Sequence, residues 1–302
     1  MEKKSLETVC IVGSGYMGAQ IGLQCAAHGY KVLLVDSLEQ SLKTASESHS
    51  VELNKRLEKG YISGEEKEAI LGRVQFTTDM EKGASNAELV IEAVPERLEI
   101  KREIFSQLDD ICPPDTIIAT NSSSIPISYI EDSTERPDRV LNMHFYSPVW
   151  ERTMVELMRG TGTSDETINS AQSFARTIGM IPLIARKESI GFIFNRVWRA
   201  IKRECLHLVD EGVASHEDVD RAFMIAMGST MGPFGRMDRV GLDVVRDIEM
   251  VYYKASGDQR DAPPQILLDK IEKGELGIKT NKGFYTYPDP AFQSNGWLKN
   301  ND

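Results

Sequence analysis

The chain has 302 residues, enough for two domains, and its 41% hydrophobic and 27% charged residues are typical of a soluble globular protein. A net charge of −11 argues against nucleic acid or an acidic membrane as a partner, and no apolar run approaches the roughly 20 residues that span a bilayer. The N-terminus is polar and shows no secretory signal, and the four cysteines are scattered without a CxxC pair. These features indicate a cytoplasmic protein with neither a zinc site nor disulfides.

The first half of the chain alternates short β-branched runs with helical patterns, which predicts βαβ units around a parallel sheet. Strands are expected at Thr8–Val12 and Lys31–Val35, with a helix between them from Ala19 to His28. Residues 38–72 are charged and helix-favouring, and predict a helical hairpin that turns at residues 60–64 and projects from the sheet. Helices are also expected around residues 104 and 171. The remaining predicted strands are Arg73–Thr77, Leu89–Val94, Thr116–Thr120, Arg139–His144, Met154–Met158 and Ile181–Ala185.

The pattern changes near Lys187, because strand-like runs vanish and amphipathic stretches such as 195–211 and 215–227 replace them. Residues 231–234 interrupt these helices, and residues 283–287 predict a short extended segment. We therefore expect an α/β Rossmann domain with a doubly wound sheet and a helical hairpin insertion over residues 1–187. An all-α C-terminal domain is expected over residues 188–302.

A glycine-rich motif directly follows the first predicted strand. Gly13, Gly15 and Gly18 form a GxGxxG that opens a helix, and Asp36 ends the next strand. These glycines allow a tight turn, close approach of the backbone to a pyrophosphate, and close packing of helix on strand. Asp36 lies 21 residues after Gly15, where a carboxylate can bond a ribose 2′-hydroxyl and would repel a 2′-phosphate. The motif predicts NAD, in preference to NADP, although a purely structural glycine turn remains an alternative.

His144 is the histidine best placed for chemistry. It ends a predicted strand, and open α/β sheets bind ligands beyond the carboxyl ends of their strands. Glu156 lies between Val155 and Leu157 in the next extended run, where a carboxylate is costly to bury unless its charge is paired. An imidazole held by a carboxylate is typical of a general base, so we predict a catalytic dyad. The alternatives are a structural His144 and a Glu156 that faces solvent on an edge strand. Among the other histidines, His49 has polar neighbours and is interpreted as solvated.

These motifs together resemble the L-3-hydroxyacyl-CoA dehydrogenase family over essentially the whole chain. The stretches that carry the resemblance are residues 13–18 with Asp36, 90–96 with Lys101, 121–126, 144–148, 155–156, 191–196, 231–234 and 283–285. The resemblance implies hydride transfer between NAD and C3 of an L-3-hydroxyacyl-CoA, of short chain length such as 3-hydroxybutyryl-CoA. It also implies a homodimer formed through the helical C-terminal domain, which would contribute to the substrate cleft.

The resemblance further implies a role for individual residues. His144 would be the catalytic base and Glu156 its orienting partner, while Ser123 and Asn195 would hold the 3-oxygen and thioester region of the substrate. The implied cofactor-binding residues are Gly13, Gly15, Tyr16, Met17, Gly18, Asp36, Ala93, Glu96, Lys101, Ser123, Ser147 and Lys279. Judged by the residues alone, residues 122–124 could be a polar turn, Asn195 a helix N-cap, and Lys101 a solvated helix lysine.

The chain departs from the common family pattern at the rim of the pocket. Ser147 replaces an asparagine, and Trp150 and Arg152 are bulky changes, whereas both members of the dyad are retained. Lys55 and Lys59 are four residues apart on the predicted hairpin and could meet the phosphates of CoA, although a basic helix face can also be simply solvated.

Two other functions stay open at this point. A dehydrogenase of the same fold could act on a small 3-hydroxy acid without CoA, as carnitine and gulonate dehydrogenases do. A non-catalytic NAD-binding protein could keep the glycine motif and lose the dyad, but His144 and Glu156 are both present.

Overall fold

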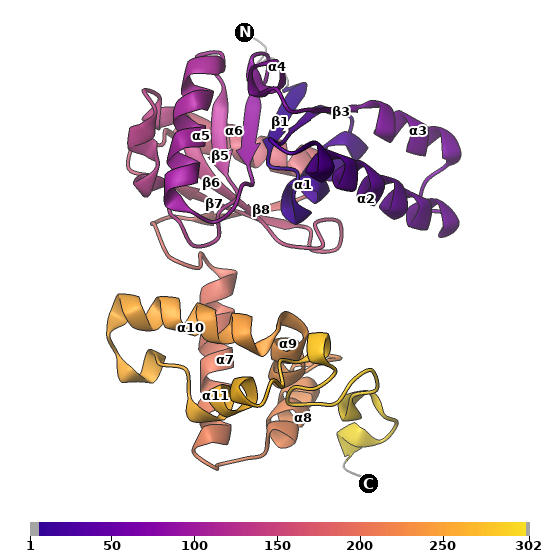
Figure 1. The fold of residues 1–302 in the computed structure, drawn as a ribbon, viewed down its shortest axis with the longest axis vertical. Coiled ribbons are helices and arrows are strands. Elements are labelled where there is room, and N and C mark those ends of the chain that lie inside the picture. The colour runs from indigo at the N-terminus through magenta and orange to yellow at the C-terminus, as the bar shows by residue number, and fades with distance from the viewer. Residues whose placement is uncertain (1–5, 300–302) are drawn as a thin grey trace. The chain divides into compact units, whose positions relative to one another are not determined.

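The computed structural model describes residues 6–299, and its helices and strands form two units, Met1–Ile193 and Phe194–Asp302 (Figure 1). The first unit is built on a sheet and the second is helical, which confirms the predicted fold class. Within residues 6–299, no helix combines the length and the apolar character that crossing a membrane requires.

The first unit contains one eight-stranded sheet with the order β3-β2-β1-β4-β5-β6-β7-β8. Strands β1 to β6 are parallel, β7 runs antiparallel to β6, and β8 runs parallel to β7. The expectation of a parallel sheet therefore holds for six strands, and the last two run in the opposite direction. The strands are β1 (Thr8–Val12), β2 (Lys31–Val35), β3 (Val74–Thr77), β4 (Leu89–Glu92), β5 (Ile117–Thr120), β6 (Val140–Phe145), β7 (Met154–Arg159) and β8 (Ile181–Ala185).

Both faces of this sheet are covered, as β1 illustrates. Val9 and Ile11 point into one apolar core, which includes residues of α1 and α6, while Cys10 and Val12 point into a second core with α5. Because side chains alternate along a strand, an unbroken apolar run is the pattern that a doubly covered strand requires. The helices of this unit are α1 (Tyr16–Ala27), α2 (Glu39–Glu58), α3 (Gly64–Gly72), α4 (Met80–Ala84), α5 (Leu98–Ile111) and α6 (Asp165–Thr177).

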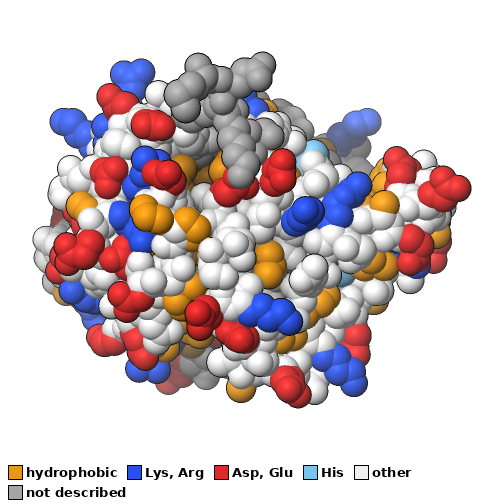
Figure 2. Space-filling model, turned by 90° about the horizontal axis from the view of Figure 1, so that it is seen from above, with side chains coloured by type: hydrophobic (Ala, Val, Ile, Leu, Met, Phe, Trp, Pro, Cys, Tyr) orange, Lys and Arg blue, Asp and Glu red, His pale blue; other side chains and the backbone are white. Residues whose placement is uncertain are grey.

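Helices α2 and α3 form the projecting hairpin, at the right of Figure 1. A capping box starts α3: Ser63 Oγ accepts the N–H of Glu66, and the Glu66 carboxylate accepts the N–H of Ser63. Seen from above in Figure 2, the outer end of the projection carries acidic side chains, and the exposed glutamates of this region are Glu58, Glu65, Glu66 and Glu68.

The second unit contains only helices and turns among its described residues, 194–299, and Asp238 organises its last segment. Residues 283–287, which were expected to be extended, form no strand; Lys282 makes isolated bridges to Gly277 and Thr286. The buried Asp238 carboxylate accepts the N–H groups of Phe284 (2.9 Å) and Tyr285 (2.8 Å), so that a side chain replaces a neighbouring strand. The helices are α7 (Phe194–Asp210), α8 (His216–Met227), α9 (Pro233–Val240), α10 (Leu242–Ser256) and α11 (Gln265–Glu272).

Candidate active site

The glycine motif forms a tight turn between β1 and α1. Gly13 has a φ of +99°, and a Cβ at Gly18 would lie 1.8 Å from the carbonyl oxygen of Gly13, so neither position accommodates a side chain. A Cβ at Gly15 would meet nothing within 4 Å. Gly15 is also the N-cap of α1 and offers no side-chain cap, which leaves the first N–H groups of the helix available to an anion in that open space.

Asp36, at the end of β2, is attached to this turn. Its Oδ2 accepts both the N–H (2.8 Å) and the hydroxyl (2.9 Å) of Ser14, and its Oδ1 accepts the N–H of Leu38 (3.0 Å). Ala93, at the end of β4, borders the turn as well, because its carbonyl oxygen would lie 2.6 Å from a Cβ on Gly13. Strands β2 and β3 are added on one side of β1, and β4 and the strands after it on the other. Open α/β sheets bind their ligands at such a switch point, here between β1 and β4.

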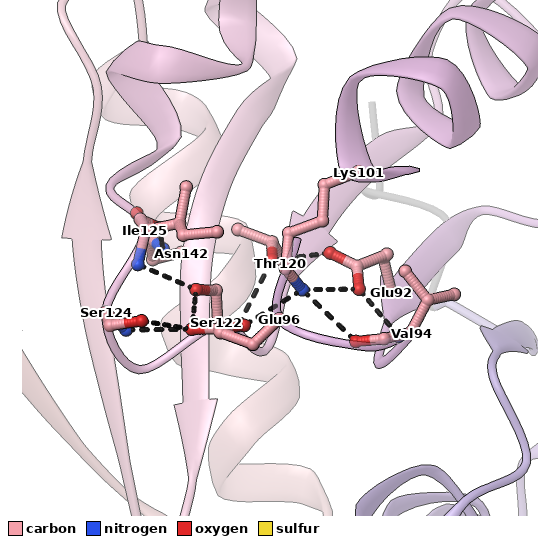
Figure 3. Close-up of polar contacts among 9 residues, drawn as sticks. All are labelled: Glu92, Val94, Glu96, Lys101, Thr120, Ser122, Ser124, Ile125 and Asn142. Carbon is pink, nitrogen blue, oxygen red and sulfur yellow. Dashed lines mark hydrogen bonds and ion pairs between the residues drawn. The ribbon is translucent and has the colours of Figure 1, made fainter. Parts of the chain in front are cut away.

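A buried ion pair lies at the ends of β4 and β5 (Figure 3). Lys101 Nζ lies 2.8 Å from Glu92 Oε1, and their side chains are only 1% and 0% exposed. Thr120 donates its hydroxyl to the other oxygen of Glu92 at 2.6 Å, and the N–H of Val94 completes its bonds. The interpretation of Lys101 as a solvated lysine is therefore wrong. The signal was in the sequence: residues 101, 105 and 108 are spaced along one buried helix face.

Glu96 extends this pair towards solvent. Its Oε2 lies 3.2 Å from Lys101 Nζ, and its side chain is 39% exposed. Its Oε1 accepts the hydroxyls of Ser122 (2.6 Å) and Ser124 (2.7 Å) and the N–H of Ser124 (3.0 Å). Although burial raises it, the pKa of the Glu96 carboxyl is lowered overall by these hydrogen bonds and by the charge of Lys101, so that Glu96 is held as a carboxylate.

His144 and Glu156 face each other across β6 and β7. They are direct partners in the antiparallel register, and His144 Nδ1 lies 3.3 Å from Glu156 Oε2. Glu156 is fully buried on an interior strand, because β7 lies between β6 and β8, so the alternative of a solvent-facing edge residue is wrong. With Nδ1 directed at the carboxylate, Nε2 is the ring atom that can exchange a proton with a substrate.

Three residues without an assigned role in the sequence argument hold this pair. Tyr146 donates its hydroxyl to Glu156 Oε2 at 2.7 Å, and the N–H of Ile193 reaches Oε1 at 3.0 Å. The ring of Phe192 stacks on the imidazole, with centroids 4.9 Å apart. Phe192 has a φ of +52°, an uncommon conformation for a side chain of this size. Tyr146 and Phe192 lie within the stretches that carry the resemblance, but no pattern shows where their rings go.

The other predicted residues of the first unit lie at the same ends of the strands. Ser123 is exposed in the loop after β5, between Ser122 and Ser124. Ser147 follows β6, is half-buried and precedes a cis peptide bond to Pro148.

Two predicted residues belong to the helical unit. Asn195 is the second residue of α7, so it is not the N-cap of that helix. Lys279 Nζ lies 2.5 Å from each carboxylate oxygen of Asp243 and remains partly exposed. Its charge is therefore partly neutralised within its own unit.

A cavity of about 700 Å³ lies beside the glycine turn, between α1 and α2. Lys55 lines it and Lys59 does not, although both are exposed. His49 lines it too but is only 1% exposed and shares a hydrogen bond of 2.7 Å with the carbonyl oxygen of Ala19, so its interpretation as solvated is wrong. The other lining residues are Ser14, Gly15, Tyr16, Ala19, Gln20, Leu23, Gln40, Ser41, Thr44, Ala45, Glu47, Ser48, Val51, Glu52 and Trp150.

The sequence matches two family models over most of its length. Residues 8–189 match the NAD binding domain of 3-hydroxyacyl-CoA dehydrogenase, and residues 191–287 match its C-terminal domain. A probable 3-hydroxybutyryl-CoA dehydrogenase of Bacillus subtilis is 34% identical over 93% of this chain and 98% of its own length. A 3-hydroxybutyryl-CoA dehydrogenase of Clostridioides difficile is 35% identical over 92% and 99%.

Solved structures give the same result. The crystal structure of (S)-3-hydroxybutyryl-CoA dehydrogenase from Ralstonia eutropha superposes with a TM-score of 0.89 at 32% identity, covering 94% of this chain and all of that one. The glycine turn fits the cofactor of such enzymes on its own geometry. Open space above Gly15 suits a pyrophosphate, and the Asp36 carboxylate suits an unphosphorylated ribose.

The charge at Asp36 predicts a strong preference for NAD over NADP. Replacing it by asparagine removes the charge and keeps one carbonyl acceptor, and kcat/KM for NADP relative to NAD should then rise at least tenfold. Ser14→Ala is the matched control, since it removes the hydroxyl bond to the same carboxylate without removing the charge. Comparable kcat/KM for the two cofactors in the unaltered protein would contradict the assignment.

Proposed function

Since this chain belongs to the 3-hydroxyacyl-CoA dehydrogenase family, we propose that it oxidises the C3 hydroxyl of a short-chain L-3-hydroxyacyl-CoA, with His144 as the base. NAD-dependent oxidation of a 3-hydroxyacyl-CoA is the activity that family and relatives share. The short acyl chain is supported by the relatives' names. The observation that carries the role of His144 is the buried pair it forms with Glu156 at the carboxyl end of the sheet.

The reaction follows from the chemistry of this pair. Nε2 of a neutral His144 takes the proton of the 3-hydroxyl as the C3 hydrogen leaves with its electron pair. Bound NAD⁺ supplies the acceptor for that hydride. The carboxylate of Glu156 stabilises the imidazolium that results and keeps Nδ1 protonated throughout. In the reverse direction the imidazolium of His144 returns the proton to the oxygen of a 3-ketone.

Two further polar residues are proposed to contact the substrate. Ser123 and Asn195 hold the reacting oxygen and the thioester region, and hydrogen bonds of this kind act by fixing the reacting geometry. The cofactor is held by the glycine turn with Tyr16 and Met17, by Asp36, and by the residues at the ends of β4 and β6. Those residues are Ala93, Glu96, Lys101 and Ser147, with Lys279 from the helical unit.

His144→Gln should lower kcat by about 10²–10⁴-fold, because that is the usual contribution of a general acid–base group. NADH affinity, measured by fluorescence titration, should stay within twofold, since no atom of the glycine turn changes. His28→Gln, at an exposed histidine just after α1, is the control and should leave both quantities unchanged. A His144→Gln enzyme within threefold of the parent would remove His144 from the mechanism.

Lys55 and Lys59 are proposed to meet the CoA phosphates. Lys55 lines the cavity next to the glycine turn, and Lys59 follows one helical turn later. Exposed glutamates surround Lys59 at the outer end of the hairpin, which carries acidic side chains in Figure 2, so the basic patch is small. An anionic substrate needs such local compensation on a chain of net charge −11.

Reversing both lysines to glutamate should raise KM for acetoacetyl-CoA at least tenfold and leave KM for NADH nearly unchanged. The increase should shrink at high salt, because exposed charges are screened within about 8–10 Å at physiological ionic strength. The same reversal at Lys31 and Lys273, two exposed lysines outside α2, controls for net charge. An unchanged KM for acetoacetyl-CoA would favour the alternative of a small 3-hydroxy acid without CoA.

The homodimer is proposed to form through the helical unit, and an apolar stripe on α10 supports it. Val244, Ile248 and Val251 are 41%, 39% and 46% exposed and lie at helical spacing, apart from the face that buries Leu242, Val245 and Glu249. Analytical ultracentrifugation should give twice the 33.8 kDa of one chain. Ile248→Asp should lower the mass to that of a monomer, whereas Lys254→Asp, at the end of the same helix, should not. A monomeric parent protein would refute the proposal.

A further inference from the structure

The loop after β5 contains three consecutive serines of unequal surroundings. Ser122 and Ser124 both bind one oxygen of Glu96, at 2.6 and 2.7 Å, and Figure 3 shows them converging on that carboxylate. Ser123 lies between them and is exposed. The backbone is therefore fixed on both sides of Ser123 by a single side chain from another loop.

Glu96 can fix the loop only if its own position is fixed, because its side chain is long and 39% exposed. Lys101 contacts it from the buried side, with Nζ 3.2 Å from Oε2, the oxygen that the serines do not bind. Lys101 is in turn fixed by Glu92 at 2.8 Å, and Glu92 has further bonds from Thr120 and from the N–H of Val94. Glu92, Lys101 and Glu96 thus form a continuous chain of ion pairs, which connects the interior of the sheet to the loop.

The two ends of the loop are also tied to the neighbouring strand β6. At its start, Asn121 accepts the N–H of Phe145, the residue after His144, at 2.9 Å. At its end, the side-chain amide of Asn142 donates to the carbonyl oxygen of Ile125 at 3.0 Å. Hydrogen bonds therefore fix the backbone at Ser123 relative to both the Glu96 carboxylate and β6, the strand that carries the proposed base.

We propose that Glu96 is a positioning residue for Ser123. It acts through its hydrogen bonds to Ser122 and Ser124, and Lys101, paired with the buried Glu92, fixes the Glu96 carboxylate. This proposal rests on the proposed role of Ser123 in holding the substrate oxygen. It adds a function for a row of charges that would otherwise only line the cofactor. Misplacing a positioning group by about 1 Å can cost 10²-fold in rate, so loss of one serine–Glu96 hydrogen bond should have a measurable effect on kcat.

A double-mutant cycle separates positioning from the other possible roles of these residues. Ser124→Ala removes one of the hydroxyls that bind Glu96 and should lower kcat about tenfold, with NADH affinity within twofold of the parent. Ser124→Thr keeps a hydroxyl and should restore at least half of kcat. In a Ser123→Ala background the same Ser124→Ala change should cost less than twofold, because there is no longer a hydroxyl to position.

A second readout does not depend on activity. Amide hydrogen exchange of residues 121–125 in the protein without substrate should become at least tenfold faster in Ser124→Ala, because the loop loses an anchor. Ser164→Ala, which removes the N-cap of α6, is the matched control for a general loss of stability and should change neither this exchange nor kcat.

The proposal is overturned if Ser124→Ala leaves kcat and loop exchange unchanged, or if it lowers kcat by the same factor with and without Ser123. A loss of NADH affinity equal to the loss of kcat would also overturn it, since these residues would then act on the cofactor alone. Failure of the proposed function is distinguishable, because it would appear as an active His144→Gln enzyme.

Discussion

The site depends on one buried charge, the carboxylate of Glu156 on an interior strand of the sheet. A carboxylate in such a place is strongly unfavourable unless its charge is compensated and its oxygens accept hydrogen bonds. Antiparallel pairing of β7 with β6 supplies His144 directly opposite, and the hydroxyl of Tyr146 and the N–H of Ile193 donate further hydrogen bonds. The need to supply hydrogen bonds to this carboxylate therefore fixes the imidazole, its tautomer and the segment that ends the first unit.

The same reasoning applies three strands away, at Glu92 on β4 and its partner Lys101 on α5. Removing one partner of a buried ion pair costs about 3–5 kcal/mol, because it leaves the other charge without compensation. Such a pair is a rigid support, and Glu96 uses it to reach the loop after β5. The β4, β5 and β6 ends are thus joined by polar contacts rather than by apolar packing. A site that must orient a small hydroxyl needs this kind of directional contact.

Local patterns in the sequence predict much of this arrangement. The GxGxxG turn, the unbroken apolar strands and the helical hairpin depend on short-range periodicity and glycine geometry, and they lie within a few residues of their expected positions. The strand-end position of His144 and the apolar neighbours of Glu156 predicted the dyad, and the resemblance to a family assigned the roles of its two members. Two signals were present and not used: Lys101 and His49 both lie on the buried stripe of their helices, with Phe105 and Leu108 in one case and Leu42 and Leu53 in the other.

The direction of β7 could have been predicted from the sequence, because residues 146–153 are too few for a parallel crossover. Other features follow from contacts that no local pattern contains. The positions of the Tyr146 hydroxyl and the Phe192 ring could not have been predicted, since each depends on how separate segments pack: Tyr146 reaches Glu156 on β7, and the Phe192 ring stacks on His144. The role of Asp238 in holding residues 284 and 285 was hidden for the same reason.

The central claim is that His144 and Glu156 act as one unit, and a double-mutant cycle on kcat/KM tests it most directly. His144→Gln and Glu156→Gln are measured singly and together with the same acyl-CoA and NADH, each variant being first shown to be folded and to bind NADH. If the carboxylate acts only through the imidazole, the double variant should be no slower than His144→Gln alone. If the two losses multiply instead, Glu156 acts independently of His144 and the account is wrong.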